Sequence, residues 1–119
     1  MALGVGAVIL ITGPLFSGKT EFARTLWPDA ATFSARVCTD AQALAADCGD
    51  LPALADRLAR QYEIITVTEV GGGVVPTDPA QRAAREAAGR LGCMLASRAD
   101  TVVRVFCGLP LVLKGVLPE

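Results

Sequence analysis

The chain of 119 residues contains no histidine, which excludes a histidine base, a histidine nucleophile and a phosphoramidate intermediate on histidine. Cysteine is present four times, at Cys38, Cys48, Cys93 and Cys107, but never in the C-x-x-C spacing. Because zinc sites draw mainly on cysteine and histidine, we expect no zinc site. Free thiols in a reducing compartment are the simplest interpretation, so we expect a cytoplasmic protein.

An excess of charge of either sign is also missing. The 11 Lys and Arg residues nearly balance the 12 Asp and Glu residues, and no basic run reaches five residues, so we expect no nucleic-acid partner. No apolar run is long enough to span a membrane, and the apolar segment 1–12 lacks the charged start of a signal peptide. Hydrophobic residues make up 52% of the chain, which favours a sheet covered on both faces, a homo-oligomer, or both.

The most informative pattern that is present lies near the start of the chain. The phosphate-binding pattern G-x-x-x-x-G-K-[ST], or Walker A motif, is matched by Gly13, Pro14, Leu15, Phe16, Ser17, Gly18, Lys19 and Thr20. An apolar run at 8–12 precedes this P-loop and a helix-compatible run at 20–26 follows it. Backbone N–H groups of such a loop surround a di- or triphosphate, and the helix N-terminus adds its positive end. We therefore expect ATP or GTP as ligand; the alternative is a strand–turn–helix without a ligand.

Within this motif, two side chains have expected roles. Lys19 would reach the β- and γ-phosphates of the nucleotide, and the hydroxyl of Thr20 would join the ligand shell of a Mg²⁺ ion.

Hydrophobic periodicity and capping residues predict alternating strands and helices. The expected strands cover residues 5–12, 31–38, 63–70 and 101–107, with 109–113 as an extended tail or an edge strand. The expected helices cover residues 19–27, 40–46 with Asp40 as N-cap, 50 to about 60 with Asp50 as N-cap, and 78–99 with a capping box at its start. This alternation predicts a single α/β domain over 1–119, a small P-loop NTPase-like sandwich with a mainly parallel sheet of about four to five strands.

Glu69 lies at the end of the expected strand 63–70. Ligands of open α/β sheets bind outside the carboxyl ends of the strands, so this carboxylate is expected to hold Mg²⁺ or to orient a hydroxyl nucleophile. The alternative is a solvated acid at a strand end. The glycines at 71–73 fit either a close approach of backbone to a ligand or a plain turn.

The expected long helix carries several arginines. Arg82 and Arg85 are one turn apart near its start, and guanidinium groups suit phosphate oxygens. The alternative is a solvated helix face paired with Glu86. Between the P-loop helix and residue 60 we find no hydrophobic run that ends in an aspartate, so we expect no central acid there.

Four segments of the second half follow one another in a defined order. Residues 69–76 read E-V-G-G-G-V-V-P, residues 82–90 read R-A-A-R-E-A-A-G-R, residues 99–102 read A-D-T-V and residues 108–114 read G-L-P-L-V-L-K. Together with the N-terminal strand and P-loop, this order resembles the adenosylcobinamide kinase / adenosylcobinamide-phosphate guanylyltransferase family of cobalamin biosynthesis. The resemblance covers residues 5–27 and 62–114.

The resemblance implies a P-loop α/β fold, a homotrimer and two activities. One is phosphorylation of the aminopropanol hydroxyl of adenosylcobinamide by ATP or GTP; the other is GMP transfer through a histidine-linked intermediate. Because this chain has no histidine, we expect the kinase activity alone. The catalytic residues would be Lys19, Glu69 and Arg85, with Arg82 and Arg90 on phosphate and with Thr20 and Glu69 at the metal. The alternatives are a non-catalytic nucleotide-binding regulator or scaffold, and a P-loop kinase of another small metabolite.

Overall fold

The computed structural model describes residues 7–69 and 78–118, so the glycines at 71–73 lie outside the described part. Its centre is one five-stranded sheet in the order β2-β3-β1-β4-β5. The strands are β1 (Ile9–Gly13), β2 (Val37–Cys38), β3 (Ile64–Thr68), β4 (Thr101–Phe106) and β5 (Leu109–Lys114). The pairings β2–β3, β3–β1 and β1–β4 are parallel, and only β4–β5 is antiparallel. The α/β fold with a mainly parallel sheet is therefore confirmed.

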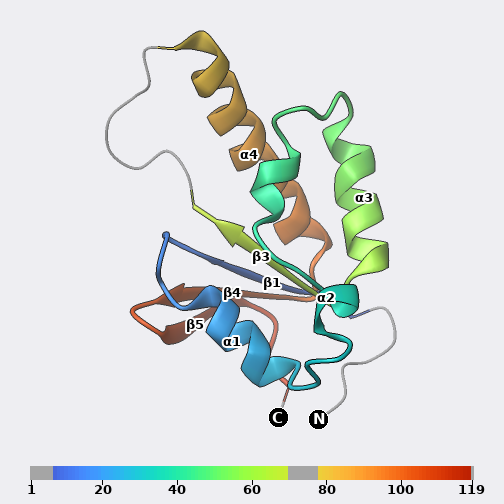
Figure 1. The fold of residues 1–119 in the computed structure, drawn as a ribbon, viewed down its shortest axis with the longest axis vertical. Coiled ribbons are helices and arrows are strands. Elements are labelled where there is room, and N and C mark those ends of the chain that lie inside the picture. Colours follow the sequence, from blue (N-terminus) through green and yellow to red (C-terminus); the bar gives the residue numbers. More distant parts are fainter. Residues whose placement is uncertain (1–6, 70–77, 119) are drawn as a thin grey trace.

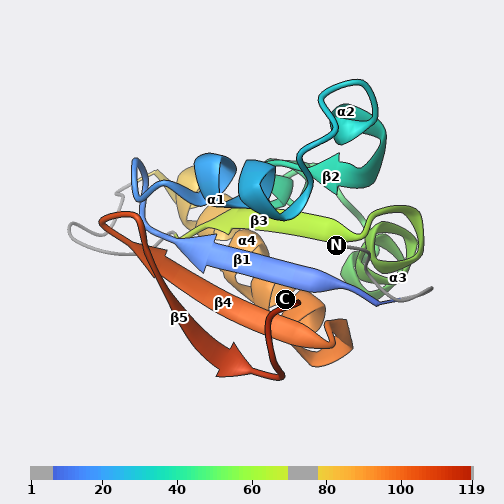
Figure 2. The ribbon, with the colours of Figure 1, turned by 90° about the horizontal axis from the view of Figure 1, so that it is seen from below.

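Helices cover both faces of this sheet. They are α1 (Lys19–Leu26), α2 (Phe33–Arg36), the 3₁₀ turn η1 (Ala41–Leu44), α3 (Leu51–Gln61) and α4 (Pro79–Arg98). Figure 1 shows α3 and α4 on one side of the sheet and α1 on the other, and Figure 2 shows the strands side by side. No helix in the described ranges combines the length and apolarity that a membrane crossing requires.

Alternation along β1 explains the two layers. Leu10 packs toward α3 and α4, together with Leu58 and Leu95, whereas Ile9 and Ile11 pack toward α1. Because successive side chains of a strand point to opposite faces, an almost wholly apolar strand can fill two cores. Each core fixes a helix against the sheet, and the ends of β1, β3 and β2 are thereby brought to one edge.

The N-caps predicted at Asp50 and Asp78 are confirmed. A carboxylate oxygen of Asp50 accepts a hydrogen bond from the backbone N–H of Ala53 at 3.1 Å, and Asp78 accepts one from Ala80 at 3.0 Å. Pro52 and Pro79 occupy the first turns of α3 and α4, where a missing N–H carries no penalty. These signals act within one helical turn, so they can be seen in the sequence.

The strand predicted at 31–38 is wrong except for its last two residues. The carboxylate of Asp29 accepts hydrogen bonds from the N–H of Ala31 and the hydroxyl of Thr32, and the Thr32 hydroxyl also accepts one from the indole of Trp27. Such side-chain bonds favour a local turn over an extended strand. Residues 33–36 therefore form the short helix α2, and only Val37–Cys38 pairs with β3.

The prediction of a helix at 40–46 capped by Asp40 is also corrected. The segment forms one 3₁₀ turn, and Asp40 has a left-handed backbone with φ of 54° and makes no side-chain cap. Its backbone N–H instead donates to the hydroxyl of Thr66 at 2.9 Å, and its carboxylate accepts from the hydroxyl of Thr68 at 2.7 Å. Contacts with β3, which lies 26 residues or more away, decide the conformation of this segment.

Candidate phosphate-binding site

The P-loop joins β1 to α1 in a conformation that two of its glycines make possible. Gly18 has φ of +96°, which side-chain-bearing residues rarely adopt. A Cβ atom at Gly13 would clash with the carbonyl oxygen of Val105 in β4. The two glycines of the motif are therefore required here, Gly18 by its backbone conformation and Gly13 by the neighbouring strand.

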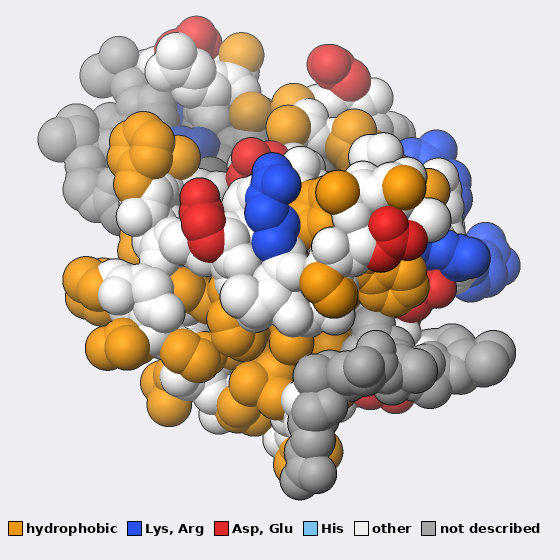
Figure 3. Space-filling model, turned by 60° about the horizontal axis from the view of Figure 1, so that its bottom comes forward, with side chains coloured by type: hydrophobic (Ala, Val, Ile, Leu, Met, Phe, Trp, Pro, Cys, Tyr) orange, Lys and Arg blue, Asp and Glu red, His pale blue; other side chains and the backbone are white. Residues whose placement is uncertain are grey.

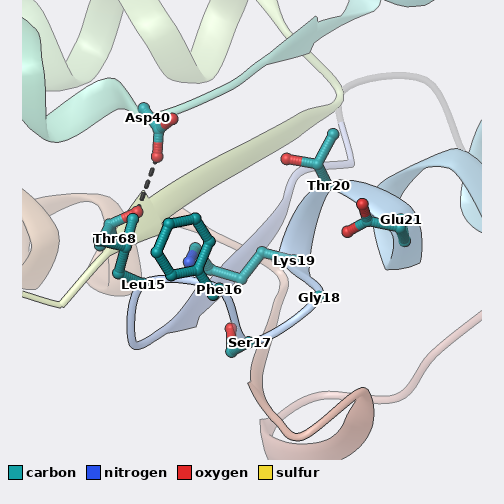
Figure 4. A pocket seen from close by; sticks show the side chains of 9 residues that line it. All are labelled: Leu15, Phe16, Ser17, Gly18, Lys19, Thr20, Glu21, Asp40 and Thr68. Carbon is teal, nitrogen blue, oxygen red and sulfur yellow. Dashed lines mark hydrogen bonds between the residues drawn. The ribbon is translucent and has the colours of Figure 1, made fainter.

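A cavity of about 490 Å³ opens above this loop (Figure 4). It is lined by Leu15, Phe16, Ser17, Gly18, Lys19, Thr20 and Glu21 from the loop and α1, and by Asp40 and Thr68 from the ends of β2 and β3. The cavity therefore lies at the carboxyl edge of the parallel strands, where ligands of open α/β sheets bind.

Lys19 is almost fully buried, with 6% of its surface exposed. Its Nζ donates a hydrogen bond to the carbonyl oxygen of Pro14 at 2.8 Å, so the cation lies across the mouth of the loop. Burial lowers the pKa of Lys19, and the negative charges of Asp40, Glu69 and Glu21 oppose that shift. The ammonium group is thus held inside the concave side of the loop, where a phosphate would compensate its loss of hydration.

Ser17 supplies a second indication that the loop fits an anion. Its side-chain hydroxyl is buried and has no hydrogen-bond partner among the described residues. An unsatisfied buried hydroxyl costs about 1–3 kcal/mol. Since Ser17 also lines the cavity, a phosphate oxygen bound there would provide the missing acceptor. The backbone carbonyl of Ser17 is held from the other side by the N–H of Gly108 at 2.8 Å.

Asp40 is a candidate site residue that the sequence analysis interpreted only as a helix cap. It follows the two-residue strand β2, which is too short to be seen as a hydrophobic run ending in an aspartate. The only available signal was the apolar Val37 and Cys38 three and two residues before it. The structure places its carboxylate in the same cavity as the hydroxyl of Thr20 (Figure 4). Mg²⁺ is usually bound by one or two carboxylates together with phosphate oxygens and water. The Asp40 carboxylate and the Thr20 hydroxyl are therefore suitable ligands for Mg²⁺.

Glu69 lies next to the loop, but its carboxylate turns to the α4 side of the sheet. Its backbone N–H donates to the carbonyl of Gly13 at 2.8 Å. Its two carboxylate oxygens accept hydrogen bonds from Arg104 at 2.7 and 2.9 Å. These bonds lower the pKa of Glu69, with smaller contributions from the charge of Lys19 and the hydroxyl of Thr12. Glu69 is therefore a charged hydrogen-bond acceptor, and Arg104 is a second residue that the sequence analysis did not single out.

The three predicted phosphate-binding arginines lie on α4. Arg90 is 3.9 Å from Glu86, one turn away, and lines a cavity between α4 and the segment 45–52. Arg82 and Arg85 belong to the first two turns of α4, and both have interaction partners. None of the three is among the described residues that line the P-loop cavity, so their contact with phosphate stays a prediction.

A mainly parallel sheet, a glycine-dependent loop after its central strand and a lysine inside that loop define a P-loop NTPase-like α/β protein. The model of the cobinamide kinase / cobinamide phosphate guanyltransferase family matches residues 30–113, and the chain belongs to this family. The match runs from the turn after α1 to β5, so the P-loop itself precedes it. No curated protein matches the chain significantly.

Membership of the family assigns the chain to cobalamin biosynthesis among nucleotide-dependent kinases and transferases, and nucleotide and cobinamide fit it as substrates. The resemblance drawn from four segments of the sequence is thereby confirmed. The length of the chain, 119 residues, fits a shortened member of the family.

Proposed function

We propose that the protein phosphorylates the aminopropanol hydroxyl of adenosylcobinamide, with ATP or GTP as the phosphoryl donor. The observation that carries this proposal is the convergence of Lys19, Thr20 and Asp40 on one cavity at the carboxyl edge of the sheet. Phosphoryl transfer depends mostly on positioning and on neutralising charge, so a small site with these groups is sufficient.

The residues of the cavity have distinct roles in this proposal. The P-loop backbone, Ser17 and Lys19 hold the β- and γ-phosphates, and Thr20 and Asp40 would hold Mg²⁺. When bound, Mg²⁺ supplies positive charge to the phosphate oxygens. Glu69, which the sequence analysis assigned to the metal, accepts a hydrogen bond from the acceptor hydroxyl or reaches the metal shell through water.

The transfer itself conserves atoms and charge. The acceptor oxygen forms a bond to the γ-phosphorus while the bond to the nucleoside diphosphate breaks, and the hydroxyl proton leaves by way of the Glu69 carboxylate to water. Arg85 is proposed to neutralise charge during this step, with Arg82 and Arg90 on phosphate oxygens. Guanylyl transfer through histidine is absent from the proposal because the chain has no histidine.

Incubation of the purified protein with γ-labelled ATP or GTP, Mg²⁺ and adenosylcobinamide tests the proposal. We expect labelled adenosylcobinamide phosphate. A folded protein that binds nucleotide and yields no product would contradict the kinase activity. That result would favour the second candidate, a non-catalytic nucleotide-binding regulator or scaffold. The second candidate is motivated by the three α4 arginines, none of which is among the described residues that line the P-loop cavity.

A cytoplasmic homo-oligomer, a trimer by the family resemblance, is part of the proposal. The sheet edge formed by β5 carries large exposed hydrophobic side chains, and Figure 3 shows such side chains gathered on this side of the molecule. They are Leu109, Leu111, Val112 and Leu113 of β5, together with Phe106 at the end of the neighbouring β4. Apolar edges of this kind are commonly covered by another chain. The molar mass in solution, measured by light scattering, tests the oligomeric state.

A further inference from the structure

A second cavity, of about 310 Å³, lies on the α4 side of the sheet. Its floor is apolar and includes Leu10, Val67 and Val102 from three adjacent strands. Its other wall is the side of α4 that carries Gly89, Gly92 and other small residues. This acceptor groove, as we call it below, is a separate space from the P-loop cavity.

The two glycines in the groove wall are not required by the packing of α4. A Cβ atom at either Gly89 or Gly92 would meet no atom of the described residues within 4 Å, and neither glycine has a positive φ. A glycine inside a helix destabilises it by about 0.5–1 kcal/mol relative to alanine. Two such positions in the middle of α4 therefore reduce stability without a packing reason in the described part of the chain, and their effect is to keep the groove open.

One end of the groove is polar and adjoins the P-loop cavity. Thr68 lines both cavities, and Glu69, the next residue, lines the groove. The carboxylate of Glu69 is fixed by Arg104 through the two hydrogen bonds described above. The backbone N–H of Glu69 binds the first glycine of the P-loop, Gly13, which joins this polar end to the phosphate-binding loop.

The groove is therefore apolar along its length and has the hydroxyl of Thr12 and the carboxylate of Glu69 at the end nearest the P-loop cavity. A ligand that matches this distribution has an aliphatic body and a terminal hydroxyl that can donate to a carboxylate. The volume lies at the lower limit of ligand pockets, about 300–1,000 Å³, so the groove suits a short arm of a molecule and not a macrocycle.

We infer that the groove between α4 and strands β3, β1 and β4 binds the hydroxyl-bearing aliphatic arm of the phosphoryl acceptor, with the hydroxyl at Thr12 and Glu69. The bulk of a large acceptor stays outside. This inference rests on the proposed kinase function. It adds the position of the second substrate, which lies between α4 and the sheet, whereas the nucleotide occupies the P-loop cavity.

Filling the groove provides the first test, with adenosylcobinamide as the probe. In Gly92→Leu and Gly89→Leu the new side chains occupy the groove, and we expect the KM for adenosylcobinamide to rise at least tenfold. The dissociation constant of the nucleotide should change less than twofold. Gly92→Ala, which adds one methyl group, should give a smaller rise in KM together with a higher melting temperature. Ser97→Leu, an exposed position of α4 outside the groove, is the matched control and should leave both constants unchanged.

The second test uses the unmodified chain and so does not depend on the folding of a variant. Cys93 is exposed and lines the groove, whereas Cys48 is partly exposed and does not line it. We expect adenosylcobinamide to slow the modification of Cys93 by methyl methanethiosulfonate at least fivefold, and to leave Cys48 unaffected, as measured by peptide mass spectrometry. Equal protection of both thiols, or of neither, would overturn the inference.

Failure of the groove and failure of the kinase proposal give different results. If the wild-type protein transfers phosphate and the two leucine variants keep its KM, the groove is not the acceptor site. If the wild-type protein transfers no phosphate, equilibrium dialysis tests binding alone. The visible absorbance of adenosylcobinamide measures how much of it the protein binds. Binding that is lost in Gly92→Leu would support the groove without kinase activity, and absence of binding by the wild-type protein would overturn it.

Discussion

The guanidinium of Arg104 holds both carboxylate oxygens of Glu69, with Nε–Oε2 and Nη2–Oε1 distances of 2.7 and 2.9 Å. The two residues come from β4 and from the end of β3, which flank β1 and its P-loop on opposite sides. Their planar groups meet in the two-bond geometry that arginine and carboxylates favour. The pair therefore ties together the two strand ends beside the loop and keeps Glu69 ionised.

Replacement of Arg104 by methionine tests this pair. The bound arginine lowers the pKa of Glu69, so the pair stabilises the fold above the unfolded pKa of a glutamate, about 4.3. That stabilisation is lost as the pH falls through the lower folded value. We expect Arg104→Met to lower the urea midpoint slightly at pH 7 and to match the wild type at a pH below the folded value. The effect is small because both side chains are more than a third exposed.

The same variant should shift the pH dependence of the kinase. Without Arg104 the pKa of Glu69 moves back toward its ordinary value, so the acidic limb of the kcat/KM profile should move to higher pH. Arg98→Met removes an arginine whose partner is Asp56, away from the site, and serves as the control. An identical acidic limb in both variants would contradict a role for Glu69 at the acceptor.

The two lysines of the chain form a matched pair for testing the nucleotide site. Lys19→Met removes the ammonium group inside the P-loop, and Lys114→Met removes one that donates to carbonyl oxygens near the end of α4. A hydrogen bond to a charged group contributes about 1.5–3 kcal/mol, so we expect nucleotide affinity to fall roughly 10- to 100-fold in Lys19→Met only. Fluorescence titration with a labelled nucleotide measures this, and an equal loss in both variants would contradict the site.

Asp40→Asn separates the role in metal binding from a structural one. The amide oxygen of asparagine can still accept the hydrogen bond from Thr68, but the negative charge that attracts a cation is lost. We expect the Mg²⁺ concentration needed for half-maximal nucleotide binding to rise at least tenfold. Asp47→Asn, at an exposed position outside the P-loop cavity, should not change it. Unaltered Mg²⁺ dependence in Asp40→Asn would exclude Asp40 from the metal site.

Gly108→Ala tests whether the β4–β5 turn supports the P-loop. Gly108 has φ of +75°, and its N–H donates to the carbonyl of Ser17. A Cβ there would meet nothing within 4 Å, so the expected loss of about 1–2 kcal/mol in unfolding free energy comes from the backbone alone. We also expect weaker nucleotide binding. Gly49→Ala, with equally open space and no positive φ, should not destabilise the protein, and similar losses in both variants would contradict this explanation.

The features that could be predicted from the sequence are those whose causes lie within a few residues. The P-loop is contiguous, and its glycines, Lys19 and Thr20 can be identified without any knowledge of their neighbours. The caps of α3 and α4 depend on Asp50 and Asp78, which bind N–H groups two or three residues away. The apolar run of β1 implies burial on both faces whatever lies beside it.

The residues that the sequence analysis misjudged are those placed by strand order. Asp40 was interpreted as a helix cap, because no local pattern shows that its backbone binds Thr66 and its carboxylate binds Thr68. Arg104 was not singled out, because its partner Glu69 is 35 residues earlier in the chain. Both contacts exist only because β3 lies between β2 and β1, with β4 on the far side of β1.

The sequence by itself determined the phosphate-binding loop, the α/β class, the family resemblance and the absence of histidine chemistry. Each of these depends on residue identity and short spacing. The tertiary structure decided which acids and arginines stand near the loop, because the pairing of distant strands sets the neighbours of each strand end. It also separated Glu69 from the loop cavity and joined it to Arg104 at the mouth of a groove between α4 and the sheet.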